Sequence, residues 1–342
     1  MYNRRQPVPT SESPVLRVLI YIQWPVKAWC IPDAQVDALR RRFPDFEFIN
    51  VNTRDEIPDA IRAADAAFTP FLTAEWVAAA PKLRWVHSSA AAVEGLLPLP
   101  ALNDRGIVVS NSRGVQAIAM AENAMGGLLV IARKLNRTLE AQREHRWIQN
   151  DLIHDWPWLL HGKRMTVVGL GTIGMEIAKR AHAFGMRVTG IRRNVDRPRP
   201  EFVNRVLPPS ALHDSLAGCD VLVLSAPGVE ATKRIVGVRE IAMLERGAVI
   251  VNVARGQVVD ELAMIDALRS GALGGAVLDV FEREPLDAGS ALWDLPNVVI
   301  TPHSSGFRAT HWDDVVDLFA ENLERFRRGE PVQNIVNTAA GY

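Results

Sequence analysis

The chain has 342 residues, of which 48% are hydrophobic, so it is long enough for about two domains with buried cores. Its 39 Lys and Arg residues balance its 39 Asp and Glu residues, which argues against nucleic acid or a membrane surface as a partner held by bulk charge. Two cysteines supply neither a disulfide framework nor a zinc knuckle, so we expect a reducing compartment, the cytoplasm, and no metal site.

The first third of the chain begins with a polar, proline-bearing stretch of fourteen residues. The apolar run after it contains Arg17 and is far shorter than the roughly 18 residues of a membrane span, so we predict no signal peptide or anchor. Strand-length and helix-length segments then alternate, at 15–22, 35–42, 46–51, 57–64, 66–68, 74–80 and 83–87. This alternation predicts βα units and a largely parallel sheet.

An alanine-rich helical stretch follows at 114–146, and we expect it to link two lobes. A second βα series has nearly unbroken apolar strands at 164–168, 187–191, 221–224, 248–253, 275–278 and 298–300. Such runs are typical of strands that helices cover on both faces. The stretch 309–328 predicts an amphipathic helix whose place in the fold the pattern leaves open. The expected class is α/β, with two Rossmann-like, doubly wound, largely parallel lobes and a cleft between them.

A glycine motif, GLGTIG, places Gly169, Gly171 and Gly174 between an apolar strand and a helical pattern. In a dinucleotide site the first glycine permits the tight turn, the second lets the backbone approach the pyrophosphate, and the third lets the helix pack on the strand. The helical pattern covers 175–183, its N-terminus would bind the anion, and Thr172 and Ile173 are further predicted cofactor contacts. We predict dinucleotide binding; the alternative is a glycine-rich turn that binds nothing.

The next strand ends in Arg192 and Arg193, where an NAD-specific site normally has an acidic residue that binds the ribose hydroxyls. Two guanidinium groups can bind a 2′-phosphate through charge-assisted hydrogen bonds, and one can stack on the adenine. The pair therefore favours NADP(H) as the cofactor. NAD(H) is the alternative if both arginines are only solvated surface residues.

Three more segments each follow an apolar strand, VNVARG at 251–256, LDVFEREPL at 278–286 and TPHSSG at 301–306. With GLGTIG, and in this order, they resemble the D-isomer-specific 2-hydroxyacid dehydrogenases from about residue 85 to residue 306. The resemblance implies that Arg255, Glu284 and His303 are catalytic. It also implies cofactor contacts at Ala226, Pro227, Thr232, Val253, Ala254, Asp279 and His303.

Reduction of a 2-oxo acid gives each catalytic residue type a role. His303 can supply a proton to the developing alkoxide near neutral pH. Glu284 would bind the other ring nitrogen and stabilise the imidazolium, and Arg255 would bind the substrate carboxylate and polarise the carbonyl group. Taken singly, each is equally well a loop or surface residue, and Asp279 is equally well a strand-end aspartate that binds backbone amides.

The same resemblance places a substrate-carboxylate loop at residues 88–95, SSAAAVEG, with alanine at 90 and 92 where the family more often has glycine. Alanine disfavours positive φ, so we expect a shifted loop or a tighter pocket. We expect the amides of Ala92 and Val93 to face the substrate. The alternative is a plain strand-to-helix turn.

The predicted organisation is a flavodoxin-like substrate domain, residues 1–112 plus 306–342, and a dinucleotide-binding Rossmann domain, residues 113–305. The implied reaction is the reversible, NAD(P)-dependent reduction of a small 2-oxo acid, such as glyoxylate or hydroxypyruvate, to the D-2-hydroxy acid. The alternative is a dinucleotide-sensing dimeric scaffold similar to the C-terminal-binding-protein corepressors. The stretch 143–160, with Trp147, Trp156 and Trp158, corresponds to the family's dimer-crossing arm, so we expect a homodimer.

Overall fold

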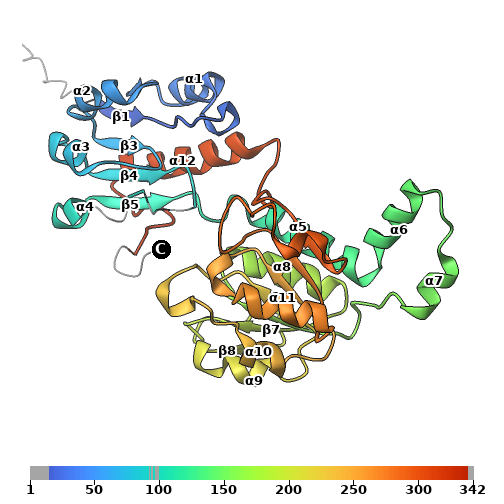
Figure 1. Ribbon diagram of the computed structural model, residues 1–342. Helices are drawn as coiled ribbons and strands as arrows, with labels where there is room; N and C mark the ends of the chain where they lie inside the picture. The colour runs from blue at the N-terminus through green and yellow to red at the C-terminus, as the bar shows by residue number, and fades with distance from the viewer. Residues whose placement is uncertain (1–14, 92, 94, 97–99, 338–342) are drawn as a thin grey trace, which may run out of the picture. The chain divides into compact units, whose positions relative to one another are not determined.

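The computed structural model describes residues 15–91, 93, 95–96 and 100–337 (Figure 1). By its internal contacts the chain divides into two compact units, Met1–Val115 with Thr310–Tyr342, and Gln116–Ala309. The functional assignment of the two predicted domains, with their boundaries at 112/113 and 305/306, stays a prediction. No helix in the described ranges is long and apolar enough to cross a membrane.

Within the described residues, the first unit contains a five-stranded parallel sheet of order β2-β1-β3-β4-β5. Its strands are β1 (Leu16–Ile20), β2 (Phe46–Asn50), β3 (Ala66–Phe68), β4 (Trp85–Ser88) and β5 (Val108–Asn111). Its helices are α1 (Asp33–Arg42), α2 (Ile57–Ile61), α3 (Ala74–Ala79), α4 (Pro100–Asp104) and α12 (His311–Arg327). This strand order is the flavodoxin-like one, with its topological switch point between β1 and β3.

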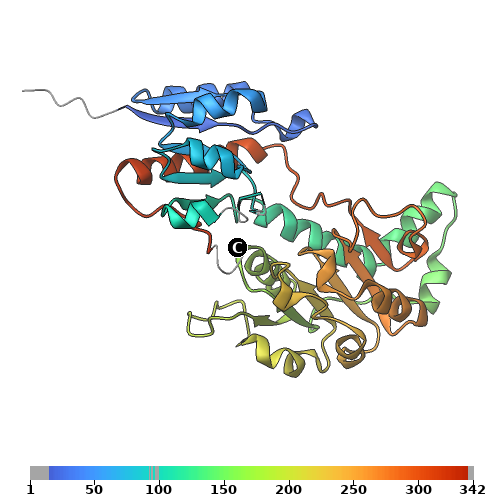
Figure 2. The same cartoon turned by 60° about the vertical axis from the view of Figure 1, so that its left-hand side comes forward.

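Alternate strand residues of this sheet bury opposite faces. Leu19 and Val86 pack in one core cluster with residues of α2, α3 and α4. Val18 and Phe68 pack in the other with residues of α1 and α12. Figures 1 and 2 both show α12 running beside the strands of this unit. Its Phe319 stacks on Phe68 with ring centroids 4.0 Å apart, so the amphipathic stretch near the C-terminus closes one face of the first sheet.

The described part of the second unit contains a seven-stranded parallel sheet of order β12-β11-β10-β9-β6-β7-β8. Its strands are β6 (Arg164–Val168), β7 (Arg187–Ile191), β8 (Arg205–Leu207), β9 (Val221–Leu224), β10 (Ala248–Asn252), β11 (Leu273–Leu278) and β12 (Val298–Ile300). The chain order reverses between β6 and β9, which is the switch point of a Rossmann sheet. These two sheets confirm the predicted α/β class with two doubly wound, largely parallel sheets.

Helices cover both faces of the second sheet. Residues of α5 (Ala117–Ala132) and α8 (Thr172–Ala183) pack in one core cluster with Val167 and Val223. Residues of α9 (Leu212–Leu216), α10 (Val238–Met243) and α11 (Glu261–Ser270) pack in the other with Val168 and Leu222. The strands are therefore buried on both sides, as their unbroken apolar runs predict.

The helical stretch predicted at 114–146 is interrupted. It forms α5 and α6 (Leu135–Arg143), and α7 (Gln149–His154) follows. Arg133 ends the first helix, and Lys134 has a left-handed backbone, with φ 56°. The amide of Trp158 donates to the Ala132 carbonyl at 2.9 Å. The segment after α7 therefore provides a partner for a carbonyl group at the C-terminal end of α5. Figure 1 shows α6 and α7 as an arm projecting from the sheet of this unit.

A polar group interrupts the apolar core of the first unit. The side chain of His87, on β4, is fully buried, and its Nδ1 lies 2.7 Å from Ser110 Oγ and its Nε2 3.2 Å from Ser112 Oγ. Burial disfavours the charged imidazolium and lowers the pKa of His87 to about 3. The ring is therefore neutral at physiological pH.

Acid should destabilise this unit through His87. The unfolded histidine binds a proton below pH 6.5, whereas the buried one binds it only near pH 3. Between these values the unfolded state holds one more proton, so the free energy of unfolding should fall by about 1.4 kcal/mol per pH unit as pH falls. In His87→Gln, urea unfolding followed by circular dichroism should lose this dependence between pH 6.5 and pH 4. Equal slopes in the two proteins would contradict the prediction.

Candidate active site

The turn from β6 to α8 has glycine at two positions where neighbouring backbone atoms leave no room for a side chain. Gly169 has φ +96°, and a Cβ there would lie 2.5 Å from the amide nitrogen of Ala226. A Cβ on Gly174 would lie 2.2 Å from the Gly169 carbonyl oxygen. The turn is therefore tight, and it packs against the loop after β9 at the switch point of the sheet.

Gly171 differs from its two neighbours in the motif. Its φ is −89°, it is exposed, and a Cβ there would meet no atom within 4 Å. Among the described residues, no side chain caps the N-terminus of α8, so the first-turn amides at Thr172, Ile173 and Gly174 have no partner within the helix. Open space in front of unsatisfied helix amides fits the pyrophosphate of a dinucleotide.

Two hydroxyl groups shape the loop after β9. Ser225 Oγ donates to the Gly169 carbonyl at 2.9 Å, which joins this loop to the glycine turn. Thr232 Oγ1 lies 2.6 Å from the Pro227 carbonyl and accepts from the amide of Val229 at 3.0 Å. Ala226 is buried at the contact with the turn. The loop that was predicted to contact the cofactor is thus held against the glycine turn, and Ser225 is a residue that the sequence analysis missed.

The two arginines after β7 lie differently. The Arg192 guanidinium donates from Nη2 to the Pro198 carbonyl at 3.2 Å and to the Arg197 carbonyl, so it holds its own loop. Arg193 is exposed. Of the pair, Arg193 is therefore the side chain that is more exposed to solvent.

Asn252 folds the loop after β10. Its Oδ1 accepts from the amide of Ala254 at 3.0 Å, and its Nδ2 donates to the carbonyl of Arg255 at 3.1 Å. Val253 and Ala254 are buried in this turn. A Cβ on Gly256 would lie 1.8 Å from the carbonyl carbon of Phe281, so the loops after β10 and β11 meet backbone to backbone. Only glycine fits there.

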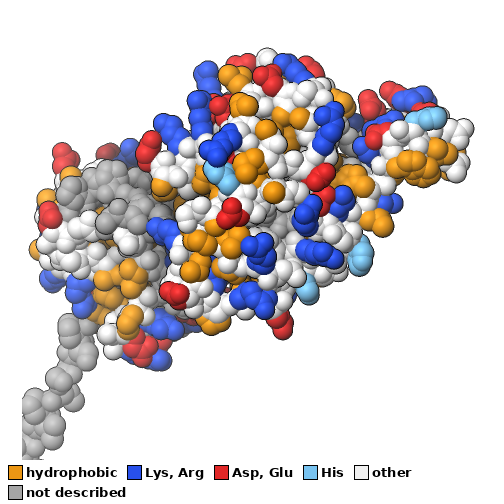
Figure 3. Space-filling view, turned by 90° about the horizontal axis from the view of Figure 1, so that it is seen from below, with side chains coloured by type: hydrophobic (Ala, Val, Ile, Leu, Met, Phe, Trp, Pro, Cys, Tyr) orange, Lys and Arg blue, Asp and Glu red, His pale blue; other side chains and the backbone are white. Residues whose placement is uncertain are grey.

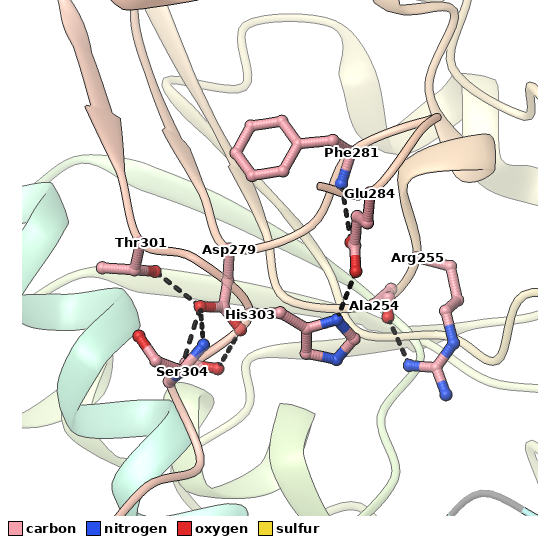
Figure 4. Close-up of polar contacts among 9 residues, drawn as sticks. Ala254, Arg255, Asp279, Phe281, Glu284, Thr301, His303 and Ser304 are labelled. Carbon is pink, nitrogen blue, oxygen red and sulfur yellow. Dashed lines mark hydrogen bonds and ion pairs between the residues drawn. The ribbon is translucent and has the colours of Figure 1, made fainter. Parts of the chain in front are cut away.

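Asp279, at the end of β11, is buried and holds the loop after β12 (Figure 4). Its Oδ1 accepts from the amides of Ser304 and Ser305 at 2.9 and 3.0 Å and from Thr301 Oγ1 at 2.6 Å. Its Oδ2 accepts from the Ser305 hydroxyl. These bonds match the second interpretation of this residue, a strand-end aspartate that binds backbone amides. Its predicted contact with the nicotinamide stays a prediction.

His303 lies in the loop that Asp279 holds. Its backbone is left-handed, with φ 51°, and its amide donates to the Asp279 carbonyl at 2.9 Å. The ring Nδ1 lies 2.7 Å from Oε2 of Glu284, whose Oε1 accepts from the Phe281 amide at 3.1 Å. The carboxylate orients the ring and places the proton on Nδ1 of the neutral tautomer. Nε2 faces away from Glu284.

The His303 and Glu284 side chains are 52% and 36% exposed, so a small molecule can reach the pair. In Figure 4 the Arg255 side chain extends from the neighbouring loop, with its Nη1 donating to the Ala254 carbonyl at 2.8 Å. The loops after β10, β11 and β12 therefore carry the three predicted catalytic side chains at one end of one sheet.

The remaining predicted site residues belong to the first unit. Ala92 lies outside the described residues. Val93 is buried, with its carbonyl accepting from the Leu96 amide at 2.8 Å. Their place opposite the substrate stays a prediction. In the described ranges, no group of three or more His, Cys, Asp or Glu side chains could hold a metal ion.

A glycine turn that fits a dinucleotide and an accessible carboxylate-paired imidazole at the ends of one Rossmann sheet are features typical of nicotinamide-dinucleotide oxidoreductases. Residues 125–305 match the family described as D-isomer specific 2-hydroxyacid dehydrogenase, NAD binding domain. The chain belongs to this family, which confirms the resemblance found in its motifs.

Relatives and solved structures agree with this family assignment. The chain is 36% identical to glyoxylate reductase of Pyrococcus horikoshii, over 75% of the chain and 77% of that protein. It is 30% identical to D-3-phosphoglycerate dehydrogenase of Archaeoglobus fulgidus over 90% of the chain, but it spans only 58% of that protein's length. It is also similar to the D-isomer specific 2-hydroxyacid dehydrogenase of Xanthobacter autotrophicus, crystallised with NADPH and MES. The TM-score is 0.80, with 30% identity over 96% of this chain and all of that one.

Proposed function

We propose that the protein reduces a small 2-oxo acid to the D-2-hydroxy acid, reversibly and with a nicotinamide dinucleotide. The observation that carries this proposal is the 2.7 Å contact between His303 and Glu284, on the same sheet as a glycine turn that fits a pyrophosphate. Relatives named glyoxylate reductase favour glyoxylate or hydroxypyruvate as the substrate. They do not favour the alternative of a dinucleotide-sensing scaffold.

Each of the predicted catalytic residues has a separate role in the proposed reaction. The bound dinucleotide supplies the hydride. His303 holds a proton at Nε2 and gives it to the carbonyl oxygen of the substrate, while Glu284 stabilises the imidazolium from Nδ1. Arg255 binds the substrate carboxylate and polarises the carbonyl group, with the amides of Ala92 and Val93 as further donors. Asp279 acts through the loop that carries His303.

A panel of 2-oxo acids tests the function. Glyoxylate, hydroxypyruvate, pyruvate and phosphonooxypyruvate would each be incubated with NADPH and with NADH, and cofactor oxidation followed at 340 nm. We expect saturable turnover of at least one acid, with the D-isomer as product in a chiral separation. Tight NADPH binding without turnover of any acid would contradict the proposal and support the scaffold.

NADP(H) is the cofactor we propose, since Arg193 is exposed at the end of β7 and a structural neighbour was crystallised with NADPH. A charge-assisted hydrogen bond is worth about 1.5–3 kcal/mol, so Arg193→Ala should raise the KM for NADPH by about 10- to 150-fold. The KM for NADH, which lacks the 2′-phosphate, should change by less than about twofold.

Arg192→Ala is the matched variant for this test. Because Arg192 binds the carbonyls of its own loop, its loss should displace Arg193 and raise the KM for NADPH by less than the loss of Arg193 itself, with the KM for NADH within about twofold. Equal effects of Arg193→Ala on the two cofactors would contradict the phosphate assignment.

We also propose a homodimer, formed through the arm of α6 and α7. The arm and the segment after it expose a set of apolar side chains, with Trp147 89% exposed: Leu135, Leu139, Trp147, Ile153, Trp156 and Leu159. Figure 3 shows apolar side chains gathered on this arm at the right of the view. An uncovered patch of this kind is typical of an interface. A monomer in sedimentation velocity at micromolar concentration would contradict the dimer.

The cytoplasm is the compartment we propose, because Cys30 and Cys219 are both free thiols.

A further inference from the structure

Three neighbouring strands of the second sheet each begin with an arginine. Arg164, Arg187 and Arg205 are the first residues of β6, β7 and β8, which lie side by side at one edge of the sheet. Arg164 and Arg187 are direct partners in the register of β6 and β7. Arg205 is the partner of Thr189, two residues further along β7. The sheet therefore gathers three positive charges at the N-terminal ends of these strands.

All three arginines lie on one face of the sheet. Successive side chains of a strand alternate between its faces, so residues an even number of positions apart share a face. On β6, β7 and β8 the arginines therefore share the face of Val168, Ile191 and Leu207, which pack in the core cluster that includes residues of α9, α10 and α11. The arginines lie at the margin of this core, where the strands begin.

A cavity of about 220 Å³ opens at this margin. The three arginines line it together with Thr189, and Asp214 and Ser215 of α9 line it from the other side. Thr166 Oγ1, on β6, donates to the Ser215 carbonyl at 2.9 Å, so the end of α9 is fixed to the sheet. The Thr189 hydroxyl has no hydrogen-bond partner among the described residues. The cavity is therefore a fixed hollow with polar groups on its walls.

The positive charge in this cavity is largely unneutralised. Arg187 and Arg205 form no ion pair and no side-chain hydrogen bond with any residue that the structure describes. The Arg164 guanidinium lies over the backbone of Gly218, where a Cβ would be 1.9 Å from its Nη2, and it approaches Glu245 Oε2 only to 3.8 Å. In the described lining, three guanidinium groups thus stand against one carboxylate, that of Asp214.

This arrangement fits an anion. Directly paired cations on neighbouring strands repel each other, and a bound anion would replace that repulsion with attraction. Guanidinium groups bind phosphate oxygens through charge-assisted, often bidentate hydrogen bonds. The volume equals that of about seven water molecules and is below the roughly 300–1,000 Å³ of sites for drug-sized ligands. A ligand of this cavity is therefore compact and negatively charged.

We propose that the cavity binds a compact anion with two linked phosphate groups, held by Arg164, Arg187 and Arg205. The starts of β6 and β8 lie about 10 Å apart across the sheet, a span that suits two phosphate groups better than one. β6 is five residues long, so about 13 Å separates Arg164 from the strand end that leads to the glycine turn. The cavity is thus distinct from the dinucleotide turn and does not depend on the proposed function.

Calorimetric titration of the full chain tests this site. The protein is first saturated with NADPH, so that the dinucleotide site is filled, and is then titrated with inorganic phosphate, inorganic pyrophosphate or ADP. Arg187→Gln and Arg205→Gln each remove one cation from the cavity, and Asp214→Asn removes the opposing carboxylate. Arg269→Gln is the matched control, because Arg269 is an exposed arginine of the same unit, at the end of α11, that does not line this cavity.

We expect one pyrophosphate to bind per chain with a Kd below about 1 mM, and more tightly than phosphate. Arg187→Gln and Arg205→Gln should each raise this Kd by about tenfold, since each removes a charge-assisted hydrogen bond. Asp214→Asn should lower it by about threefold, because a repelling charge is lost. Arg269→Gln should stay within about twofold of wild type. Binding of ADP as tightly as pyrophosphate would support the site with a nucleotide as the source of the phosphates, and weaker binding of ADP would support it with a free small anion.

Three results would overturn the inference. The first is the absence of saturable pyrophosphate binding up to about 1 mM in the NADPH-saturated protein. The second is an unchanged Kd in both Arg187→Gln and Arg205→Gln, with melting temperatures that show both variants to be folded. The third is an equal loss of binding in Arg269→Gln, which would mean that pyrophosphate binds exposed arginines of this unit in general.

Discussion

His303→Ala should lower the rate of 2-oxo acid reduction by about 10²- to 10⁴-fold, the range that a general acid contributes, and leave the Kd for NADPH within about twofold. The Glu284 carboxylate orients the imidazole at 2.7 Å through Nδ1, and the ring is half-exposed, so Nε2 is the nitrogen left for a substrate. The rate is measured as kcat with the best 2-oxo acid, and the Kd by NADPH fluorescence. Full activity in this variant would end the assignment of the proton donor.

Two further variants sharpen this test. Glu284→Gln keeps a hydrogen bond to the ring but removes the charge that stabilises the imidazolium, so we expect a smaller loss of about 10- to 100-fold. His213→Ala is the matched control, because His213 also pairs with a carboxylate in this unit, with Nε2 2.9 Å from Glu240 Oε1. It should retain wild-type kcat. A comparable loss in the control would show that any broken histidine–glutamate pair impairs the enzyme.

Gly171→Asp should weaken NADPH binding by about 100-fold or more and leave the fold intact. The backbone at Gly171 has φ −89°, which any residue adopts, and a Cβ there meets nothing within 4 Å. A carboxylate at this point would stand where the pyrophosphate is expected and repel it. The Kd from NADPH fluorescence and the melting temperature check the two parts of the prediction.

Gly174→Ala is the contrasting variant. Its Cβ would lie 2.2 Å from the Gly169 carbonyl oxygen, so α8 would have to move, and we expect a loss of about 1–3 kcal/mol in stability. If Gly171→Asp unfolded the protein while Gly174→Ala did not, the roles assigned to the two glycines would be wrong.

Most strands described in the second unit were predictable, because burial on both faces gives apolar runs, as at 248–252. β5 and β8 were missed for different reasons. β8 is a three-residue edge strand with one exposed and two half-buried residues, so it carries no apolar run. β5 has an exposed valine at its start and polar residues at its end. The break after α5 was also hidden, because Trp158, far along the chain, binds the helix end at Ala132.

At the site, residue type and order predict a role for His303, Glu284 and Arg255, but they do not predict which residues hold these side chains in place. Asn252 is the last residue of an apolar strand and Ser225 directly follows another, and many polar residues in such positions only contact solvent. Their contacts depend on the register of neighbouring strands, which one sequence does not specify. Asp279 had two interpretations, and its oxygens bind backbone amides of the loop that carries His303, which are brought to it only by the fold.

Every contact found to orient His303 comes from the loops after β11 and β12 of the second unit: Asp279 through the backbone, and Glu284 through the ring. The segment proposed to receive the substrate carboxylate belongs to the other unit and is braced by its own strand β5. The residues proposed to transfer the proton and the residues of the first unit predicted to face the substrate therefore lie in separate stretches of the chain, and Arg255 belongs to the former stretch. Residues 88–95, together with Asn111 and Ser112 that bind them, could therefore be exchanged to change the substrate without altering His303 and Glu284.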